Sequence, residues 1–289
     1  MRRFAGVLLA AFVFLLAACA NLTAAPAPVT VPAPVPPQNT VPMAAYEEPV
    51  YQLEDVTEEG KTVVESADAA HYLYQLLSLS VPNLEALSPG DAEIARRNVD
   101  NFNSRMDALM RDVLARGREM GEDAAELYEA GGLAEPYYDE TCAGFYQAGQ
   151  VISVRLDNSS YTGGAHPNSY TASQNFDLGA GQFIDPAQAA DDPESFRAGA
   201  AELLLEKAEA LESRAEFWTD YAEIIARWNE GSAVFDGEGM LVIFSPYELG
   251  PYSMGSVELR LSYEELADLV GPGGMARLGL GAEEPGEEK

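Results

Sequence analysis

The sequence predicts an α+β fold in which an antiparallel sheet is packed by helices. Two observations support this class: apolar residues recur at helical spacing near the middle of the chain, and they alternate with polar residues in several shorter runs. A third is the length between the compositionally biased ends of the chain. Roughly 220 residues suit a single globular region, either undivided or made of two subdomains.

The first 18 residues have the parts of a lipoprotein signal peptide. Arg2 and Arg3 give a basic start, residues 4–18 are apolar, and Leu-Ala-Ala precedes Cys19. The apolar stretch is shorter than the about 20 residues that cross a bilayer. We therefore expect cleavage before Cys19 and lipidation of that residue; the alternative is an ordinary signal peptide with an incidental cysteine. Asn21 favours the outer membrane, so the predicted location is the bacterial cell envelope, facing the periplasm or the cell surface.

Two segments are expected to contribute no core. Residues 19–47 are rich in Ala and Pro and predict an extended tether. Residues 272–289 are rich in Gly and Glu and predict an acidic disordered tail. The folded region between them divides into an N-terminal α+β part, residues 48–135, and a C-terminal α+β part, residues 136–271.

The N-terminal part predicts three strands and one long helix. The strand-like runs cover residues 49–56, 62–65 and 71–81. A helix of about five turns begins near Ser88, and residues 124–128 either extend it or form a short second helix. The apolar stripe of this helix consists of Ile94, Phe102, Met106, Leu109 and Val113.

The C-terminal part predicts five strands and three helices. Three half-buried antiparallel strands lie around Cys142 and over residues 152–157 and 170–176. Residues 240–244 form a continuous apolar run, which predicts a strand covered on both faces, and residues 256–261 alternate. Ser262 begins a capping box that opens a short last helix. The other two helices are predicted from the apolar sets Phe196, Ala200, Leu203, Leu211 and Phe217, Tyr221, Ile224, Trp228.

The charge of the chain limits its partners. The formal net charge is −30, and removal of Arg2 and Arg3 with the signal peptide makes it −32. Such a chain repels nucleic acid and anionic lipid, so no nucleic-acid partner is expected and the predicted membrane contact is the lipid anchor. Clustered carboxylates attract cationic proteins over long range, although the same charge also serves solubility alone.

We predict no catalytic, cofactor-binding or metal-binding residues. The patterns G-x-S-x-G, G-x-x-x-x-G-K-[ST], H-E-x-x-H and C-x-x-C do not occur. His71 is expected to be a hydrogen-bonded structural residue of a strand, and His166, the other histidine, lies in a loop. Because Cys19 would carry lipid, Cys142 has no partner for an internal disulfide. It lies in a strand-like segment and is predicted to be a buried strand residue.

Two loops carry the candidate binding residues. The first has the sequence YTGGAHPN (residues 161–168), and the second has the sequence SPYELGPYSMG (residues 245–255). Glycines permit positive φ, prolines reduce the entropy lost on ordering, and tyrosines are frequent anchors of recognition surfaces. These residue types favour a recognition surface and ordinary turn chemistry equally.

These loops, in this order between these strands and helices, resemble the RsiV-like lysozyme-binding domain of anti-sigma factors, which is also found beside PdaC-type peptidoglycan deacetylases. The likeness also includes LSYEEL (residues 261–266) and Phe176-Asp177-Leu178 with Gly181. It extends over residues 137–269, so we interpret residues 136–271 as the RsiV-like domain. A lipobox stands in place of the transmembrane helix of that family, and signalling to a sigma factor is therefore not expected.

The resemblance implies an α+β domain that binds a muramidase or cell-wall glycan. It places the contact at Tyr161, His166, Tyr247, Pro251 and Tyr252. The first hypothesis is a non-enzymatic lipoprotein that binds and blocks a basic lysozyme-type muramidase. The second is a peptidoglycan or glycan binding module without a protein partner, and a structural envelope lipoprotein is the third.

Overall fold

The computed structural model describes residues 46–55, 63–67, 70–75, 77–132 and 136–280. The predicted signal peptide, Cys19 and all but the last two residues of the predicted tether lie outside these ranges. The described residues from Glu47 onward form one compact unit, and it has the predicted α+β class. Within the described residues, no helix is long and apolar enough to cross a lipid bilayer.

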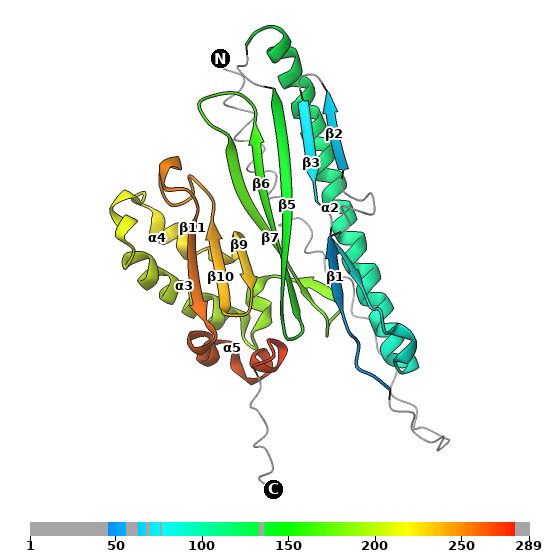
Figure 1. Cartoon of the computed structure of the whole chain (residues 1–289). Coiled ribbons are helices and arrows are strands. Elements are labelled where there is room, and N and C mark those ends of the chain that lie inside the picture. Colours follow the sequence, from blue (N-terminus) through cyan, green and yellow to red (C-terminus); the bar gives the residue numbers. More distant parts are fainter. Residues whose placement is uncertain (1–45, 56–62, 68–69, 76, 133–135, 281–289) are drawn as a thin grey trace, which may run out of the picture. The chain divides into compact units, whose positions relative to one another are not determined.

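The larger sheet has six strands in the order β2-β3-β5-β6-β7-β8 (Figure 1). Its neighbours are antiparallel except for β3 and β5, which run parallel with Ala70 opposite Tyr137. This pair joins residues on both sides of the boundary predicted at 135, so the two predicted parts share one sheet. The strands are β2 (Val63–Ala67), β3 (Ala70–Tyr74), β5 (Tyr137–Ala148), β6 (Val151–Tyr161), β7 (Asn168–Asp177) and β8 (Gln182–Ile184).

The single strand predicted over residues 71–81 is divided in two. Its second half, β4 (Leu77–Ser80), leaves the large sheet and pairs with β1 (Gln52–Asp55). At the division, the side-chain oxygen of Gln75 accepts a hydrogen bond from the N–H of Ala143 at 2.9 Å. The Gln75 side chain therefore bonds to β5 at the point where the chain turns away from the large sheet. Sequence periodicity does not encode such a long-range contact.

The sequence predicted the environments of two residues of the large sheet, Cys142 and His71. Cys142 lies in β5 as predicted, but its side chain is exposed, and the prediction of burial was wrong. The buried side of this stretch instead carries Tyr137 and Asp139. His71 lies in β3, with its Nε2 3.4 Å from a carboxylate oxygen of Glu140 on the neighbouring strand.

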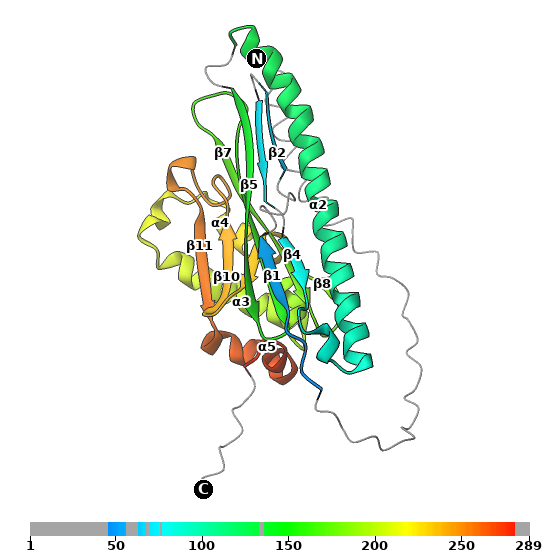
Figure 2. The ribbon, with the colours of Figure 1, turned by 45° about the vertical axis from the view of Figure 1, so that its right-hand side comes forward.

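The long helix α2 (Pro89–Glu129) lies along the large sheet (Figures 1 and 2). Ser88 caps its start, and the helix is 41 residues long, about 11 turns, because residues 124–128 extend it. Phe102 and Met106 of the predicted stripe are buried. Ile94 is 42% exposed, since Ala92 and Ala95 make the contact in the first turns. The short 3-10 turn η2 (Leu84–Ala86) precedes the helix.

The smaller sheet has three antiparallel strands in the order β11-β10-β9. Every residue of β10 is buried, as its continuous apolar run predicts, and β11 alternates between buried and more exposed residues as predicted. β9 was not predicted, because apolar and polar residues do not alternate in its four-residue sequence. The bounds are β9 (Ser232–Phe235), β10 (Gly239–Phe244) and β11 (Val257–Ser262).

The outer edge of β9 lies against polar side chains of the large sheet. The hydroxyl of Ser153 accepts a hydrogen bond from the N–H of Phe235 at 2.9 Å, and that of Ser173 accepts one from the N–H of Ala233 at 3.0 Å. The Asn175 amide donates to the Ala233 carbonyl at 3.0 Å. The polar positions of β6 and β7 thus lie against a second sheet here, whereas their alternation predicted strands that are only half-buried.

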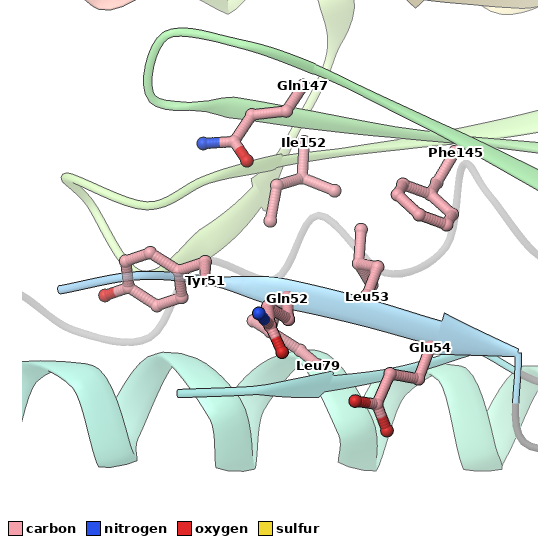
Figure 3. Close-up of a pocket in the computed structure, with 8 residues that line it drawn as sticks. All are labelled: Tyr51, Gln52, Leu53, Glu54, Leu79, Phe145, Gln147 and Ile152. Atoms are coloured by element: carbon pink, nitrogen blue, oxygen red, sulfur yellow. The ribbon is translucent and has the colours of Figure 1, made fainter. Parts of the chain in front are cut away.

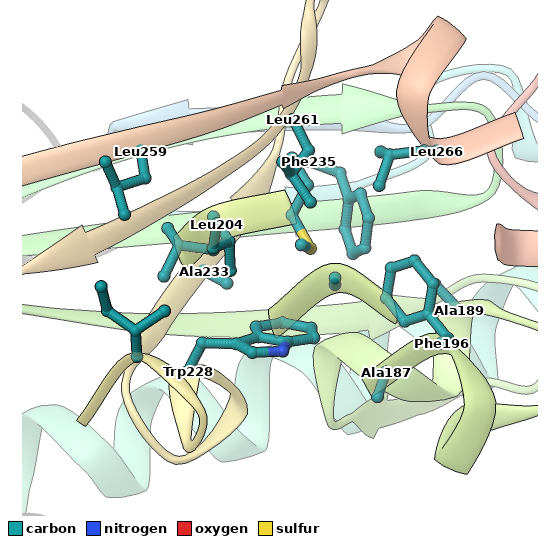
Figure 4. Close-up of a cluster of buried hydrophobic side chains, with 14 of the residues drawn as sticks. Ala187, Ala189, Phe196, Leu204, Trp228, Ala233, Phe235, Leu259, Leu261 and Leu266 are labelled. Atoms are coloured by element: carbon teal, nitrogen blue, oxygen red, sulfur yellow. The ribbon is translucent and has the colours of Figure 1, made fainter. Parts of the chain in front are cut away.

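The other face of the small sheet packs on helices and contains the largest core. Phe196, Leu204, Trp228 and Phe235 point toward one another there (Figure 4). The sequence was wrong on two details: Leu204 rather than Leu203 is fully buried, and the second predicted helix is one short helix between 3-10 turns. The elements are η3 (Pro186–Ala189), α3 (Pro193–Glu209), η4 (Glu212–Glu216), α4 (Tyr221–Ile225) and η5 (Trp228–Glu230).

The C-terminal helix continues beyond the predicted end of the domain. The predicted capping box of Ser262 and Glu265 is present at the start of α5 (Tyr263–Arg277). The backbone leaves the helical conformation at Gly271, with φ 73°, and then resumes it. The prediction of a disordered tail from residue 272 is therefore wrong for residues 272–280, and residues 281–289 lie outside the described part of the chain.

Candidate functional site

The two loops that sequence singled out lie side by side. The first, residues 162–167, connects β6 to β7, and the second, residues 245–256, connects β10 to β11. The hydroxyl of Ser245 accepts a hydrogen bond from the N–H of Thr171 in β7 at 3.0 Å. This bond fixes the start of the second loop close to the end of the first.

An imidazole and two phenol rings join the loops. His166 stacks on Tyr252, with ring centroids 3.6 Å apart and planes inclined by 11°. His166 Nε2 also lies 3.2 Å from the hydroxyl of Tyr247, and the two tyrosine rings are 5.6 Å apart. His166 Nδ1 lies 2.7 Å from the Pro167 carbonyl, which only accepts, so in the neutral ring the proton is on Nδ1 and Nε2 accepts from Tyr247.

Tyr247 has an unusual backbone that neighbouring groups hold in place. Its φ is 73°, the only positive φ of a non-glycine residue in the described part of the chain. The indole N–H of Trp218 donates to the Tyr247 carbonyl at 3.1 Å, and the Trp218 N–H donates to the Leu249 carbonyl at 2.8 Å. Residues in such strained conformations concentrate at functional sites.

The cluster presents aromatic surface to solvent. Tyr247 is 55% exposed and Trp218 is 41% exposed, while His166 and Tyr252 are half-buried against each other. We define His166, Trp218, Tyr247 and Tyr252 as the aromatic cluster. Large aromatic side chains held rigidly at the surface are the usual anchors of binding interfaces.

The remaining predicted contact residues have supporting positions. Pro251 precedes the 3-10 turn η6 (Tyr252–Met254), and its carbonyl accepts from the N–H of Met254 at 3.0 Å, which orients Tyr252. Tyr161 is buried, and its hydroxyl donates to the Gly164 carbonyl at 3.2 Å. It therefore stabilises the first loop and is not part of the aromatic cluster.

Trp218 was missed from sequence. It lies next to Phe217 but outside the apolar spacing shared by Phe217 and Tyr221, and this off-stripe position was the available signal. An aromatic residue that a helical stripe leaves out is a candidate for another contact. Its hydrogen bond to Tyr247, however, depends on a loop 29 residues away.

The surroundings of the cluster are acidic. Glu216 and Asp220 flank Trp218 in the chain and are exposed. The nearby Arg214 is engaged elsewhere, with its guanidinium 3.9 Å from the ring centroid of Tyr221. Burial raises the pKa of Glu248, although the hydrogen bond from the Ser245 N–H partly opposes this. The described residues contain no group of three or more His, Cys, Asp or Glu side chains placed to hold a metal ion.

A separate hollow of about 310 Å³ lies between β1 and the β5–β6 hairpin (Figure 3). Leu53, Phe145 and Ile152 point into it, and the polar ends that border it belong to scattered side chains. The Tyr51 hydroxyl there already accepts a hydrogen bond from Asn98. Small-molecule sites combine an apolar lining with converging polar groups, and the second property is weak in this hollow.

Comparison with known proteins identifies one family segment and a shared fold. Residues 205–264 match the family described as Protein of unknown function (DUF3298). A DUF3298 family protein from Bacteroides fragilis superposes with a TM-score of 0.55 at 14% identity, covering 80% of this chain and 97% of that chain. A DUF3298 family protein from Pseudomonas aeruginosa superposes with a TM-score of 0.45 at 16% identity, covering 79% of this chain and 97% of that chain. No protein with a curated description matches the sequence. The matched segment contains Trp218, Tyr247 and Tyr252.

Proposed function

We propose that this chain is a non-enzymatic lipoprotein of the bacterial cell envelope that binds and inhibits a basic lysozyme-type muramidase. The observation that carries the proposal is the joining of two distant loops by the stack of His166 on Tyr252, beside the strained and exposed Tyr247. These are the loops that resemble the contact loops of RsiV-like domains. A surface of this kind is preorganised, so little conformational entropy is lost when a partner binds.

The charge of the chain supports a basic partner. A formal net charge of −30 creates a field that attracts cationic proteins from a distance, and Glu216 and Asp220 add exposed carboxylates close to Trp218. Charge of this kind raises association rates, whereas desolvated aromatic anchors govern dissociation. The aromatic cluster and the acidic surface therefore have separate roles in the proposed complex.

The membrane attachment in this proposal rests on Cys19 and the residues before it. Intact-mass measurement of protein extracted from membranes should show cleavage before Cys19 and added acyl chains. The variant Cys19→Ala should leave the membrane fraction. A mature chain that still contains residues 4–18 would contradict this part of the proposal.

A glycan-binding module is the second candidate, and the exposed rings of Trp218 and Tyr247 favour it. The apolar faces of sugar rings pack on aromatic side chains of this kind, which have an apolar body and a polar tip. This binding needs no charge on the ligand. Salt therefore separates the two candidates, because screening weakens attraction to a cationic enzyme and leaves stacking on a neutral glycan almost unchanged.

The experiment is a binding assay with two ligands side by side. Immobilised full-length chain is offered a basic c-type lysozyme and, separately, purified insoluble peptidoglycan, and muramidase activity is followed in the first case. We expect capture of lysozyme and loss of its activity in proportion to the chain added. Capture of peptidoglycan alone, unaffected by salt, would replace the muramidase proposal with the glycan-binding one.

A further inference from the structure

We propose that β11 is a dimerisation strand, which pairs antiparallel with β11 of a second copy of this chain around a twofold axis at Leu259. β11 is an edge of the three-stranded sheet and, with six residues, the longest edge strand in the described part of the chain. It contains no proline, lysine or bulge, the features by which natural sheets usually prevent edge pairing.

The register of the sheet shows which backbone groups of β11 face outward. The N–H of Asp236 donates to the Gly239 carbonyl at 2.9 Å, which makes these two residues a hydrogen-bonded pair of the β9–β10 hairpin. Bonding alternates along antiparallel strands, so Val242 faces β11 and its partner Leu259 faces β10. The N–H and C=O groups of the residues on either side of Leu259 therefore point away from the sheet.

The two edges of this sheet differ sharply. On the β9 edge, Ser153, Ser173 and Asn175 supply hydrogen bonds to the outward backbone groups. Among the described residues, no comparable donor or acceptor meets the outward backbone groups of Glu258 and Arg260. The backbone groups of the β9 edge are bonded within the molecule, whereas those of the β11 edge remain available to pair with another strand.

The side chains of β11 fit a second copy in this register. When Leu259 lies opposite Leu259 of the second copy, each Glu258 lies opposite an Arg260, and both pairs form at once because of the twofold symmetry. Glu258 of one copy and Arg260 of the other then form a backbone hydrogen-bonded pair across the two strands. Opposite charges at directly opposed positions stabilise a sheet. The pairing would join two three-stranded sheets into one of six strands.

Each of these charges already has a partner within its own chain, and both pairs leave room for a second contact. Glu258 lies 2.8 Å from Arg155, and Arg260 lies 2.6 Å from Asp236. The side chains of Glu258 and Arg260 remain 42% and 32% exposed. Arg260 also lies 3.4 Å from Glu238, and these existing ion pairs restrict both side chains, so less rotamer entropy is lost on pairing.

The test is sedimentation equilibrium of the purified full-length chain in density-matched detergent. Reductant is present throughout, because Cys142 is exposed and could crosslink. The unsubstituted chain should dimerise. Glu258→Arg and Arg260→Glu should each weaken the dimer by about tenfold or more, since each places like charges opposite each other twice. The double exchange Glu258→Arg with Arg260→Glu restores opposite charges and should restore the dimer.

Two further variants separate pairing from folding. Glu258→Pro removes an outward N–H without touching the ladder to β10, whereas Glu258→Ala removes the same side chain and keeps the N–H. Proline should abolish dimerisation, alanine should retain most of it, and circular dichroism should show both folded. A chain that is monomeric at all concentrations would overturn the proposal. So would a dimer that neither the single exchanges nor proline weakens, or one that the double exchange fails to restore.

Discussion

At the scale of single residues, the contact between α2 and the large sheet depends on glycine. Asp139 is buried and accepts hydrogen bonds from the hydroxyl of Tyr74 at 2.7 Å, from that of Tyr137 at 3.3 Å and from the amide of Asn158 at 2.6 Å. Burial raises the pKa of both tyrosines, so their hydroxyls remain protonated donors to the Asp139 side chain into the alkaline range. Gly117 of α2 provides the space for Tyr74.

We predict that Gly117→Ala destabilises the chain. A Cβ at this position would lie 2.0 Å from the Tyr74 hydroxyl and 3.0 Å from an Asp139 oxygen. Overpacking costs about 1–3 kcal/mol, which exceeds the roughly 1 kcal/mol that alanine gains over glycine in a helix. Chemical denaturation of the full-length chain measures the difference.

The matched control is Gly90→Ala in the same helix. A Cβ there meets only the Ser88 hydroxyl oxygen, at 3.9 Å. This variant should therefore be neutral or stabilising by up to roughly 1 kcal/mol, and Tyr74→Phe should relieve part of the cost of Gly117→Ala. Equal stabilities of the two alanine variants would show that Tyr74 does not limit this position.

The properties of single residues also explain how much of the candidate site could be predicted from sequence. His166, Tyr247 and Tyr252 were found because proline, glycine and aromatic residues together in a loop have few structural explanations. Trp218 was missed because its role depends on a hydrogen bond to a loop distant in sequence. Tyr161 was included because its burial under the first loop leaves no mark in the sequence.

At the scale of elements, regular periodicity was the reliable guide. β10 and β11 were predicted from a continuous run and an alternating run, and α2 from its stripe and its cap. Only Tyr221–Ile225 of the second predicted helix of the C-terminal part is α-helical, because helical spacing over residues 217–228 also fits a chain that packs apolar residues from successive turns. Such turns differ from a helix in backbone hydrogen bonds, which apolar spacing does not specify.

The C-terminal helix was underestimated for a specific reason. Gly271 and Gly273 suggested disorder, yet a Cβ at either position would lie within 2.6 Å of a carboxylate oxygen of Asp191. The N–H of Gly273 donates to that carboxylate at 2.9 Å, and the N–H of Asp191 donates to the Val270 carbonyl at 2.9 Å. The glycines are present because a distant carboxylate caps the second half of α5.

We predict that Asp191→Ala loosens this half of α5 and costs about 1 kcal/mol, the usual cost of losing a helix cap. Arg277 is held by Asp177 at 3.1 Å and by the Ala189 carbonyl at 2.6 Å. Trypsin should therefore cut after Arg277 faster in the variant, which mass spectrometry of the released peptide measures. Asp191→Asn keeps an acceptor oxygen and should stay protected; equal cleavage of the two variants would rule out the capping role.

At the scale of the whole molecule, the α+β class was predicted correctly, whereas the pairing of distant segments was not predicted. The parallel pairing of β3 with β5 links segments on both sides of the predicted boundary, and β9 docks edge-on against the large sheet. Both arrangements depend on residues far apart in sequence, and local patterns carry no information about such pairings. The charge of −30, by contrast, is a property of the whole chain that sequence alone provides.

The central claim is that the aromatic cluster, rather than charge alone, binds a basic muramidase. The most direct test is the kinetics of binding between the full-length chain and a basic c-type lysozyme at several salt concentrations. Tyr252→Ala should cost about 2 kcal/mol or more, mainly through faster dissociation, and His166→Ala should cost less. Phe145→Ala is the control, because it removes an exposed aromatic ring of β5 that belongs to neither loop and should leave dissociation unchanged.

Salt should slow association without abolishing binding, since screening above physiological strength, where the screening length is about 8 Å, acts on the long-range field and spares close contacts. The account predicts that dissociation of the unsubstituted complex depends little on salt and strongly on Tyr252. If Tyr252→Ala and His166→Ala dissociate like the unsubstituted chain while added salt removes binding entirely, the interaction is charge attraction alone and the claim is wrong.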